Sequence, residues 1–322
     1  MPPTSLKHAS RPPVNTSRHP FHDSVLLAEV VESLAPAPHR VIVDGTLGGG
    51  GHTAALLAAG AEVFGIDHDP EALEFASRRA ATFGGRFHAV AGSFAQAGRL
   101  LEEIGVGQID GALLDLGISS HQLDTPERGF SFQSEGPLDM RMDPAGRVTA
   151  ADLVNTASGE ELERILREFG EEPAAHRIAV RLTRDRLARP FETTSELADA
   201  VEAVVPRHGR THPATRTFQA LRIAVNRELE ALEQGLTQLS ARLSQGGRFA
   251  VITFHSLEDR IVKTFFKHRS TEWLDRPEWP EQRRNPEHIF RAITRKAVIA
   301  SAAEQRTNPR ARSAKLRVVE RL

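Results

Sequence analysis

The sequence predicts an α/β protein with a mostly parallel sheet into which an all-helical segment is inserted. Over the first third of the chain, short apolar runs alternate with helical patterns, which is typical of a parallel sheet covered by helices on both faces. This alternation stops between about residues 123 and 216, where helix starts occur without convincing strand patterns. Strand patterns resume near the C-terminus, so we expect the sheet to continue after the insertion.

The first βαβ unit is the clearest part of the pattern. The apolar run over residues 41–43 predicts a buried strand that leads into Asp44 and a glycine-rich turn. Small residues over 53–59 favour a helix, and the run over residues 62–66 predicts a second strand that ends at Asp67.

Other segments predict the rest of the sheet and its covering helices. Apolar residues recur every three or four positions from Phe218 to Leu243, which predicts one long amphipathic helix that Gly246 and Gly247 end. The remaining expected elements are helices over residues 21–34, 70–81 and 257–266 and strands near residues 87–90, 109–116, 248–254, 293–299 and 316–319.

The middle of the chain carries signals of helix starts. Ser158 with Glu161, and Thr193 with Glu196, have the spacing of a capping box. Residues 1–20 are rich in Pro, Ser and His and lack periodicity, so we expect a disordered extension there. We therefore divide the chain into this extension, a sheet domain over residues 21–123 and 216–322, and an inserted helical domain over residues 124–215.

Composition limits the class of protein. With 322 residues, 40% of them hydrophobic and 26% charged, the chain can bury a sizeable core. It contains no cysteine, which excludes disulfides, thiolate metal sites and a thiol nucleophile, and we predict no metal site. No apolar run approaches the roughly 20 residues that span a bilayer, and no signal peptide is visible. We expect a soluble, cytoplasmic protein without a membrane partner.

Charge is distributed unevenly along the chain. The formal net charge is only -1, but residues 260–322 hold 16 Lys and Arg against 7 Asp and Glu. Five basic residues and no acidic residue lie between Arg306 and Arg317. This pattern is compatible with a solvated tail or with an edge that contacts nucleic-acid phosphates.

The glycine loop between the first strand and the first helix predicts a ligand site. It runs from Asp44 to His52 with four consecutive glycines, and Asp67 follows 23 residues after Asp44 at the tip of the second strand. A carboxylate there can accept hydrogen bonds from the ribose hydroxyls of an adenosine, whether in a dinucleotide or in S-adenosylmethionine. The loop lacks a clean G-x-G-x-x-G, and Asp44 suits a methionine ammonium better than a pyrophosphate, which favours S-adenosylmethionine.

Six ordered motifs carry a resemblance that covers the chain from about residue 21 to the C-terminus. The motifs are His22-Asp-Ser-Val-Leu-Leu27, Asp44 to His52, Leu114-Asp-Leu-Gly-Ile-Ser-Ser-His-Gln122, Arg128-Gly-Phe-Ser-Phe132 with Gly136-Pro-Leu-Asp-Met-Arg-Met-Asp143, Phe254-His-Ser-Leu-Glu-Asp-Arg-Ile-Val262, and Asn308-Pro-Arg-Ala-Arg-Ser-Ala-Lys-Leu-Arg317. The sequence in these motifs closely resembles the bacterial 16S ribosomal RNA cytosine-N4 methyltransferases of the MraW (RsmH) type.

The resemblance implies a fold, a reaction and a set of contacts. The fold would be a class I methyltransferase sheet, Rossmann-like and mostly parallel, with an inserted helical domain. The cofactor would be S-adenosylmethionine, and the substrate the exocyclic N4 amine of a decoding-centre cytosine of 16S ribosomal RNA in the small ribosomal subunit. The cofactor contacts implied by the resemblance are Gly50, Gly51 and His52 in the loop, Asp67 at the ribose, Phe94 beside the adenine, and Asp115 and Gln122 at the fourth strand.

Several of these residues also have ordinary structural interpretations. Phe94 could be a core aromatic residue, Gln122 a solvated loop residue, and His52 the first residue of a helix. Asp115 is harder to explain in this way, because a charged group that ends a buried apolar run needs a partner or a wet site.

Methyl transfer to an amine depends mainly on positioning and on acceptors for the amine hydrogens. Many amino-methyltransferases use an Asp/Asn/Ser-Pro-Pro-aromatic motif at the fourth strand, and this sequence departs from it. We therefore hypothesise that Asp115 and Ser119 accept from the amine. His255 is a further candidate as proton acceptor or RNA contact, whereas Ser256 with Asp259 reads as an approximate helix cap.

Substrate binding would need an aromatic platform and cations. A target base must leave its stack, and Phe130 and Phe132 could stack on it or could simply join a lid to the core. Arg207, Arg210 and Arg216 and the basic C-terminal segment would contact phosphates. Two other functions stay open at this point, a nicotinamide-dependent oxidoreductase and a non-catalytic ribosome-assembly factor, and the sequence leaves the oligomeric state undetermined.

Overall fold

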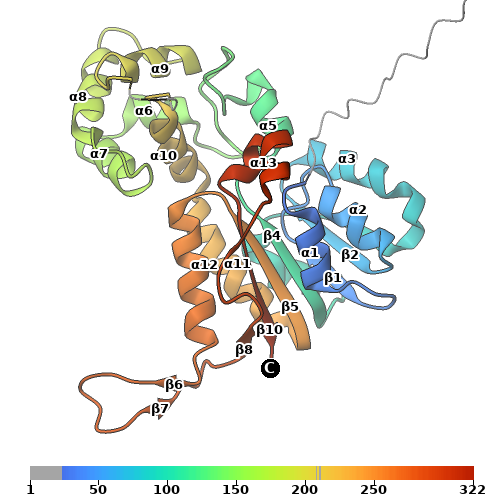
Figure 1. Cartoon of the computed structure of the whole chain (residues 1–322). Coiled ribbons are helices and arrows are strands. Elements are labelled where there is room, and N and C mark those ends of the chain that lie inside the picture. Colours follow the sequence, from blue (N-terminus) through green and yellow to red (C-terminus); the bar gives the residue numbers. More distant parts are fainter. Residues whose placement is uncertain (1–23, 208, 210–211) are drawn as a thin grey trace, which may run out of the picture.

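The computed structural model describes residues 24–207, 209 and 212–322, so the extension expected over residues 1–20 lies outside the described part. An eight-stranded sheet forms the centre of the molecule, with the strand order β3-β2-β1-β4-β5-β10-β8 and β9 paired to β10 (Figure 1). Strands β3, β2, β1, β4 and β5 are parallel, whereas β10 runs antiparallel to β5, β8 and β9. This is the order of a Rossmann-like sheet that reverses beside β1, and it confirms the class I methyltransferase fold.

The strands of this sheet have seven or fewer residues, except β5, which has eleven. They are β1 (Val41–Asp44), β2 (Glu62–Asp67), β3 (Phe87–Ala91), β4 (Ile109–Asp115), β5 (Leu243–Thr253), β8 (Phe290–Ala292), β9 (Val298–Ile299) and β10 (Lys315–Arg321). A separate hairpin of β6 (Trp273–Leu274) and β7 (Arg283–Arg284) extends from one end of the sheet domain (Figure 1).

Both faces of the sheet are buried, which explains why its strands read as continuous apolar runs. Successive residues of β1 enter different cores: Val43 packs with α11 and α12, whereas Ile42 packs with α1 and α2. The helices of the sheet domain are α1 (Leu27–Leu34), α2 (Gly51–Ala58), α3 (Pro70–Ala80), α4 (Ala97–Glu103), α5 (Ser120–Asp124), α11 (Glu228–Arg242), α12 (Ser256–Arg269) and α13 (Ala302–Thr307), with 3-10 turns η1 (Ala81–Arg86), η2 (Phe94–Gln96), η3 (Pro126–Arg128) and η4 (Pro309–Arg312).

The prediction of one long helix from Phe218 to Leu243 is wrong in two respects. It is divided into α10 (Thr215–Asn226) and α11, because Arg227 adopts a left-handed conformation with φ of 50°. The apolar spacing continues across this break, so periodicity could not reveal it. The predicted stop at Gly246 is also wrong, because α11 already ends at Arg242 and Gly246 lies within β5 at a shift in its register with β4.

In its described part, the inserted segment folds into four α-helices that share a core with α10. They are α6 (Ala150–Thr156), α7 (Gly159–Glu168), α8 (Ala175–Asp185) and α9 (Thr194–Glu202). Thr193 and Glu196 form the complete capping box that their spacing predicts, whereas Ser158 caps α7 without a reciprocal bond from Glu161. Phe218 of α10 is buried in this same core, and the domain division at residues 123 and 216 stays a prediction.

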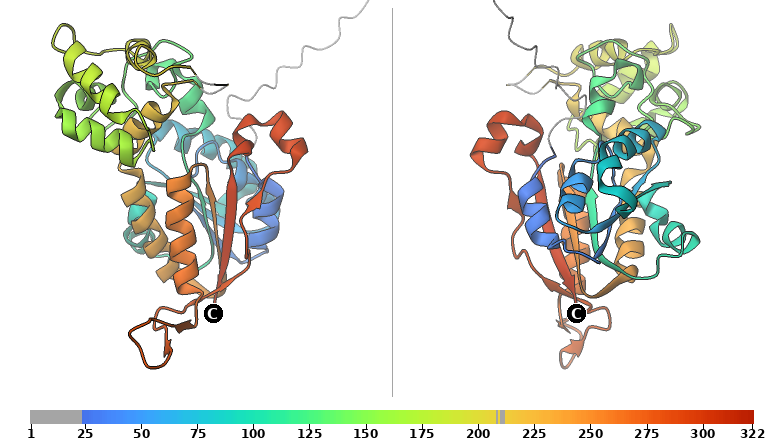
Figure 2. Two further views of the ribbon diagram at one scale, coloured as in Figure 1. Left: turned by 60° about the vertical axis from the view of Figure 1, so that its left-hand side comes forward. Right: turned by 90° about the vertical axis from the view of Figure 1, so that its right-hand side faces the viewer.

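The helical segment and the β6–β7 hairpin lie at opposite ends of the sheet domain. Figure 2 shows the helical segment and α13 at one end and the β6–β7 hairpin at the other. Among the described residues, no helix is both long enough and apolar enough to cross a membrane.

Candidate active site

A cavity of about 640 Å³ opens where the parallel strands β1, β2 and β4 end, between the sheet domain and the segment that leads into the helical insert. This is the edge at which doubly wound sheets bind their ligands. The cavity brings together most of the predicted site residues, namely Gly51, His52, Asp67, Phe94, Asp115, Ser119 and Gln122. Two other predicted site residues, Gly50 and His255, are not among the described residues that line the cavity.

The glycine loop packs tightly against its surroundings. Gly50 has a positive φ of 67°, and a Cβ there would lie 3.0 Å from the Cβ of Ala76 in α3. A Cβ on Gly51, the first residue of α2, would lie 2.0 Å from Oγ of Ser24. Gly50 therefore allows the loop to pack against α3, and its role at the cofactor stays a prediction.

Asp44 does not face the ligand space, contrary to the sequence interpretation. It is 1% exposed, and its carboxylate accepts from the backbone N–H of Thr46 at 3.2 Å and from Oγ1 of Thr53 at 2.7 Å. Burial raises its pKa. The carboxylate therefore stabilises the loop from beneath, and it is not available to a methionine ammonium.

Asp67 lies at the cavity wall at the end of β2. Oδ2 accepts from the backbone N–H of Gly48 and Oδ1 from that of Asp69, each at 2.9 Å. Burial raises the pKa of this carboxyl, and these hydrogen bonds oppose the rise. Each oxygen keeps a further lone pair for a donor from the cavity, which fits an acceptor of ribose hydroxyls.

Phe94 is held between two glycines. A Cβ on Gly45 would lie 3.1 Å from Cβ of Phe94, and a Cβ on Gly235 of α11 would lie 2.4 Å from Cδ2 of its ring. The ring is partly buried and lines the cavity. It therefore joins α11 to the glycine loop, and one part of its surface stays available to a flat ligand.

Asp115 ends β4 and presents an unsatisfied oxygen. Its Oδ1 is buried and has no hydrogen-bond partner among the described residues. Burial raises the pKa of this carboxyl to about 7, although the charge of Arg310 opposes the rise. A buried acceptor at a cavity wall can accept from a donor in the cavity, whether a ligand or a water molecule.

His52 is 4% exposed and lines the cavity beside Asp115. Its Nε2 donates to the backbone oxygen of Val25 at 3.0 Å, and burial lowers its pKa, so the ring is neutral. Nδ1 then carries a lone pair, and it lies 3.6 Å from Oδ2 of Asp115. This distance is longer than a hydrogen bond. When the Asp115 carboxyl is protonated on Oδ2, that proton points toward the lone pair on Nδ1 of His52. Oδ1 then stays available to accept a hydrogen bond from the cavity.

Ser119 and Gln122 form a capping box at the start of α5. Oγ of Ser119 accepts from the backbone N–H of Gln122 at 3.1 Å, and Oε1 of Gln122 accepts from the N–H of Ser119 at 3.0 Å. The Ser-x-x-Gln spacing could have indicated this in the sequence. The Ser119 hydroxyl keeps its proton as a donor and a second lone pair, so its role as amine acceptor stays a hypothesis.

His255 caps α12, one residue before the predicted cap at Ser256. Its Nδ1 accepts from the backbone N–H of Glu258 at 3.4 Å, and its Nε2 lies 3.1 Å from Oε1 of Glu258. Ser256 instead donates to Glu171 of the helical segment. Among the described residues Nε2 of His255 has no hydrogen-bond partner, and His255 does not line the cavity, so its role as proton acceptor or RNA contact stays a prediction.

Three potential metal ligands meet beside the cavity. Glu228, His255 and Glu258 offer ligand atoms that lie within 4.8 Å of one another. Arg222, however, donates to both carboxylate oxygens of Glu228, at 2.8 and 2.9 Å. A cation would have to displace or repel this guanidinium, so we interpret the group as an ion-pair network that joins α10, α11 and α12.

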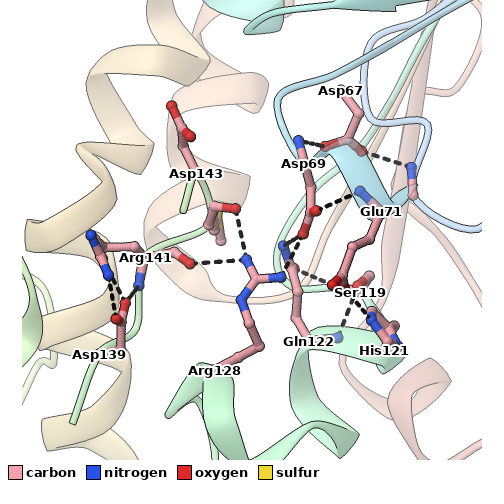
Figure 3. A network of polar contacts seen from close by, with 12 residues as sticks. Asp67, Asp69, Glu71, Ser119, His121, Gln122, Arg128, Asp139, Arg141 and Asp143 are labelled. Atoms are coloured by element: carbon pink, nitrogen blue, oxygen red, sulfur yellow. Dashed lines mark hydrogen bonds and ion pairs between the residues drawn. The ribbon is translucent and has the colours of Figure 1, made fainter. Parts of the chain in front are cut away.

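Arg128 connects the sheet domain to the roof of the cavity, which we define as residues 141–148. Figure 3 shows its guanidinium between Asp69 and the backbone oxygens of Arg141 and Met142. The corresponding distances are 2.6, 3.1 and 2.9 Å, and the Asp69 side chain is only 3% exposed. Asn226 holds the same segment through the backbone N–H of Met142 at 2.7 Å.

Two aromatic residues predicted as a stacking platform lie elsewhere. Phe130 is buried in the core of the helical segment, and Phe132 stacks on His212 and packs against the edge of Phe218. Phe254, at the end of β5, lines the cavity instead. Phe254 ends the strand predicted over residues 248–254, and this place at a strand end is the sequence signal that could have indicated it.

Arg310 is the main site residue that the sequence reasoning treated only as part of a basic run. It lies in η4, lines the cavity, and donates through Nη2 to the backbone oxygen of Ile118. Other cations of this run are engaged elsewhere, since Lys315 and Arg317 both pair with Asp259. Arg306 and Arg312 are exposed, as are Arg207 and Arg216, whereas Arg210 lies outside the described residues.

The chain is similar to known proteins over nearly its whole length. The model of the MraW methylase family matches residues 19–322. The chain is 52% identical over 307 residues to a ribosomal RNA small subunit methyltransferase H from Trichlorobacter lovleyi, covering 94% of this chain and 98% of that protein. It is 50% identical to the protein of the same name from Geobacter sulfurreducens, covering 94% and 99%. With the Rossmann-like sheet and the cavity at its strand ends, these matches establish that the chain belongs to the MraW methylase family.

Proposed function

We propose that this protein transfers a methyl group from S-adenosylmethionine to the exocyclic N4 amine of a decoding-centre cytosine in 16S ribosomal RNA. The family and the relatives named for small-subunit ribosomal RNA methylation support the reaction and the class of RNA. The choice of N4 and of this cytosine comes from the resemblance in six motifs. The substrate would be met as part of the small ribosomal subunit in the cytoplasm.

The residues at the strand ends fit the cofactor. S-adenosylmethionine, when bound, supplies an activated methyl group on a positively charged sulfur. Asp67 would hold the ribose hydroxyls, the backbone of the glycine loop would approach the methionine part, and Phe94 would lie beside the adenine. Gln122 and Gly51 line the same space.

The observation that carries the proposal is the buried, unpaired Oδ1 of Asp115 at the wall of this cavity. The lone pair of a cytosine amine is delocalised into the ring, so the amine becomes more nucleophilic when an acceptor holds its hydrogens. Oδ1 offers such an acceptor. When the new C–N bond forms, the nitrogen must lose a proton, and a carboxyl group with a pKa of about 7 can accept it near neutral pH.

The surrounding charges support an RNA substrate. Arg207, Arg216, Arg306 and Arg312 are exposed, and cations of this kind contribute sequence-independent affinity for phosphates. Arg147 and Arg79 also line the cavity and could neutralise phosphates beside the target nucleotide.

The test uses purified protein, methyl-labelled S-adenosylmethionine and small subunits that lack cytosine methylation. After digestion of the RNA, we expect the label in N4-methylcytidine from 16S RNA, identified by mass. Label in another base would retain the methyltransferase but reject the target. Cofactor binding without any transfer would favour the assembly-factor function.

The roles of Asp115 and Ser119 are tested by the two alanine variants, singly and together. We expect Asp115→Ala to reduce transfer strongly and Ser119→Ala to reduce it less, because Ser119 also caps α5. Full methylation by the double variant would reject both residues as amine acceptors.

A further inference from the structure

One wall of the cavity combines three chemically different groups. We call Asp115, Phe254 and Arg310 the distal wall. Asp115 offers a buried acceptor oxygen, Phe254 a half-buried aromatic ring, and Arg310 a guanidinium whose donors have a fixed fork geometry. None of these three was needed to explain the ribose or the glycine loop.

Arg310 is held in place from both ends. Oδ1 of Asn308 accepts from its backbone N–H at 3.2 Å, and the next residue, Ala311, is 1% exposed and packs in the core against α1 and α2. At the other end, Nη2 donates to the backbone oxygen of Ile118, three residues after Asp115. The side chain therefore reaches from the C-terminal segment to the loop that follows β4.

The guanidinium also lies close to the other two groups of the distal wall. Its Cζ atom is 5.9 Å from the centroid of the Phe254 ring. Its charge acts on Asp115, where it opposes the effect of burial on the pKa of that carboxyl. The distal wall thus brings a buried acceptor oxygen, a guanidinium and a flat apolar ring to the same cavity.

We propose that the distal wall is the base pocket, in which Arg310 donates to the ring N3 and O2 of the target cytosine while Asp115 accepts from its N4 amine and Phe254 contacts the ring. This proposal rests on the proposed function. The Watson–Crick edge of cytosine presents one donor and then two acceptors, which is the complement of one carboxylate oxygen and a two-pronged guanidinium.

The same arrangement disfavours the other bases. Uracil presents an acceptor where cytosine has its amine, and a donor at N3. Its acceptor would therefore face the acceptor of Asp115, and its donor would face a donor of Arg310. Adenine offers an amine and only one ring acceptor on this edge. Unpaired polar groups in a buried site are costly. The pocket would therefore select cytosine because each other base would leave Asp115 or Arg310 without a hydrogen-bond partner.

The experiment combines a change in the enzyme with a change in the substrate. Small subunits carry either cytidine or 3-deazacytidine at the target position, the latter replacing the N3 acceptor by C–H. We expect the unaltered protein to favour cytidine in kcat/KM by roughly 10- to 100-fold. Arg310→Met should lose a similar factor on cytidine and should no longer distinguish the two substrates.

Three controls separate recognition from folding. Arg78→Met removes an exposed arginine that pairs with Glu74 in α3, away from the predicted RNA contacts, and should leave both values unchanged. The affinity of Arg310→Met for S-adenosylmethionine should stay within about twofold of that of the unaltered protein. If Arg310→Met loses cofactor binding, the ratio of kcat/KM on cytidine to kcat/KM on 3-deazacytidine is measured with Arg310→Lys instead. One ammonium group cannot reach both N3 and O2, so this ratio should be smaller than in the unaltered protein.

The possible outcomes are distinct. Discrimination against 3-deazacytidine that survives in the arginine variants would overturn the role of Arg310, even if overall activity fell. Equal rates on both substrates with the unaltered protein would overturn it as well. If the unaltered protein methylates no cytosine in the unmodified subunit, the proposed function fails, and that result is seen before any variant is made.

Discussion

Asp115 shows how a single residue can combine a structural cost with a function. A carboxyl group at the end of a buried strand loses hydration, and no described donor compensates its Oδ1. The pKa of about 7 is the direct result of that burial. Strongly perturbed groups of this kind gather at functional sites, and here the group also lines the cavity.

The activity should follow the ionisation of Asp115. The carboxylate is the form that accepts a proton, so kcat/KM should rise with pH, with a midpoint near pH 7, and then level off. In Asp115→Asn this rise should disappear, and the rate at pH 8 should fall by roughly 10²- to 10⁴-fold. Initial rates measured between pH 5.5 and about 9 test this, and the same pH profile in the variant would contradict it.

The same residue should reduce the stability of the protein. Because the folded-state pKa lies above the ordinary value of an aspartate, about 3.9, the folded state binds the proton more tightly, and stability falls as pH rises from about 4 to about 7. Asp115→Asn should therefore be more stable than the unaltered protein at pH 8, by about 1 to 3 kcal/mol. Denaturant titrations measure the free energy of unfolding of both proteins, and the difference between them should vanish near pH 4. A variant that is less stable than the unaltered protein at pH 8 would contradict this prediction.

At the scale of elements, close packing between α11 and η2 positions the ring of Phe94 at the cavity wall. Gly235 leaves space for the Phe94 ring, although glycine lowers the helical propensity of α11. Helix propensity and site geometry therefore favour different residues at this position.

Gly235→Ala should weaken cofactor binding. The new Cβ would lie 2.4 Å from Cδ2 of Phe94, so the ring must move. We expect the Kd for S-adenosylmethionine, measured by calorimetry, to rise by about tenfold or more, a loss of about 1.4 kcal/mol. Gly159→Ala in α7 is the matched control, because its Cβ would make only an ordinary contact of 3.6 Å with Thr183. An unchanged Kd for Gly235→Ala would show that the Phe94 position is unimportant.

The roof depends on a guanidinium with several partners. Arg128 joins a buried carboxylate to two backbone oxygens, and a lysine cannot reproduce that geometry. We expect Arg128→Lys to raise the Kd for S-adenosylmethionine about tenfold and to increase hydrogen exchange across residues 141–148. Arg164→Lys, at an exposed pair on α7, should change neither quantity. Normal exchange at the roof in Arg128→Lys would count against this connection.

At the scale of the whole molecule, the net charge of -1 conceals a separation of charge. Part of the basic C-terminal segment is used inside the protein, through the pairs of Lys315 and Arg317 with Asp259 and through Arg310 in the cavity. Among the described residues, exposed arginines of the helical segment and of the C-terminal segment, such as Arg216 and Arg312, remain accessible to a polyanion.

Binding of the small subunit should therefore weaken as salt rises, while cofactor binding should change little. Each phosphate contact contributes to the slope of log K against log salt. Arg312→Ala should reduce that slope by about 0.7 to 0.9, measured by filter binding from about 50 to 200 mM salt. A slope unaffected by Arg207→Ala, Arg216→Ala and Arg312→Ala together would place the RNA contact elsewhere.

The sequence by itself determined the class of fold, the order of the first strands and the family. Alternating apolar runs, a glycine loop and an acid at the next strand are local signals, and backbone geometry converts them directly into a βαβ unit. Asp67 and Asp115 could be placed at the ligand edge because each ends a predicted strand, whereas Phe94 was implied only by the family resemblance.

Only the tertiary structure decided which of the remaining residues share the cavity. Asp44 and Asp115 both end buried strands, yet one is satisfied beneath the loop and the other keeps a free oxygen at the wall. Arg310 comes from 195 residues further along the chain than Asp115, and only the return of the C-terminal segment brings the two together. Such long-range contacts depend on how the elements pack, and no local pattern in the sequence records them.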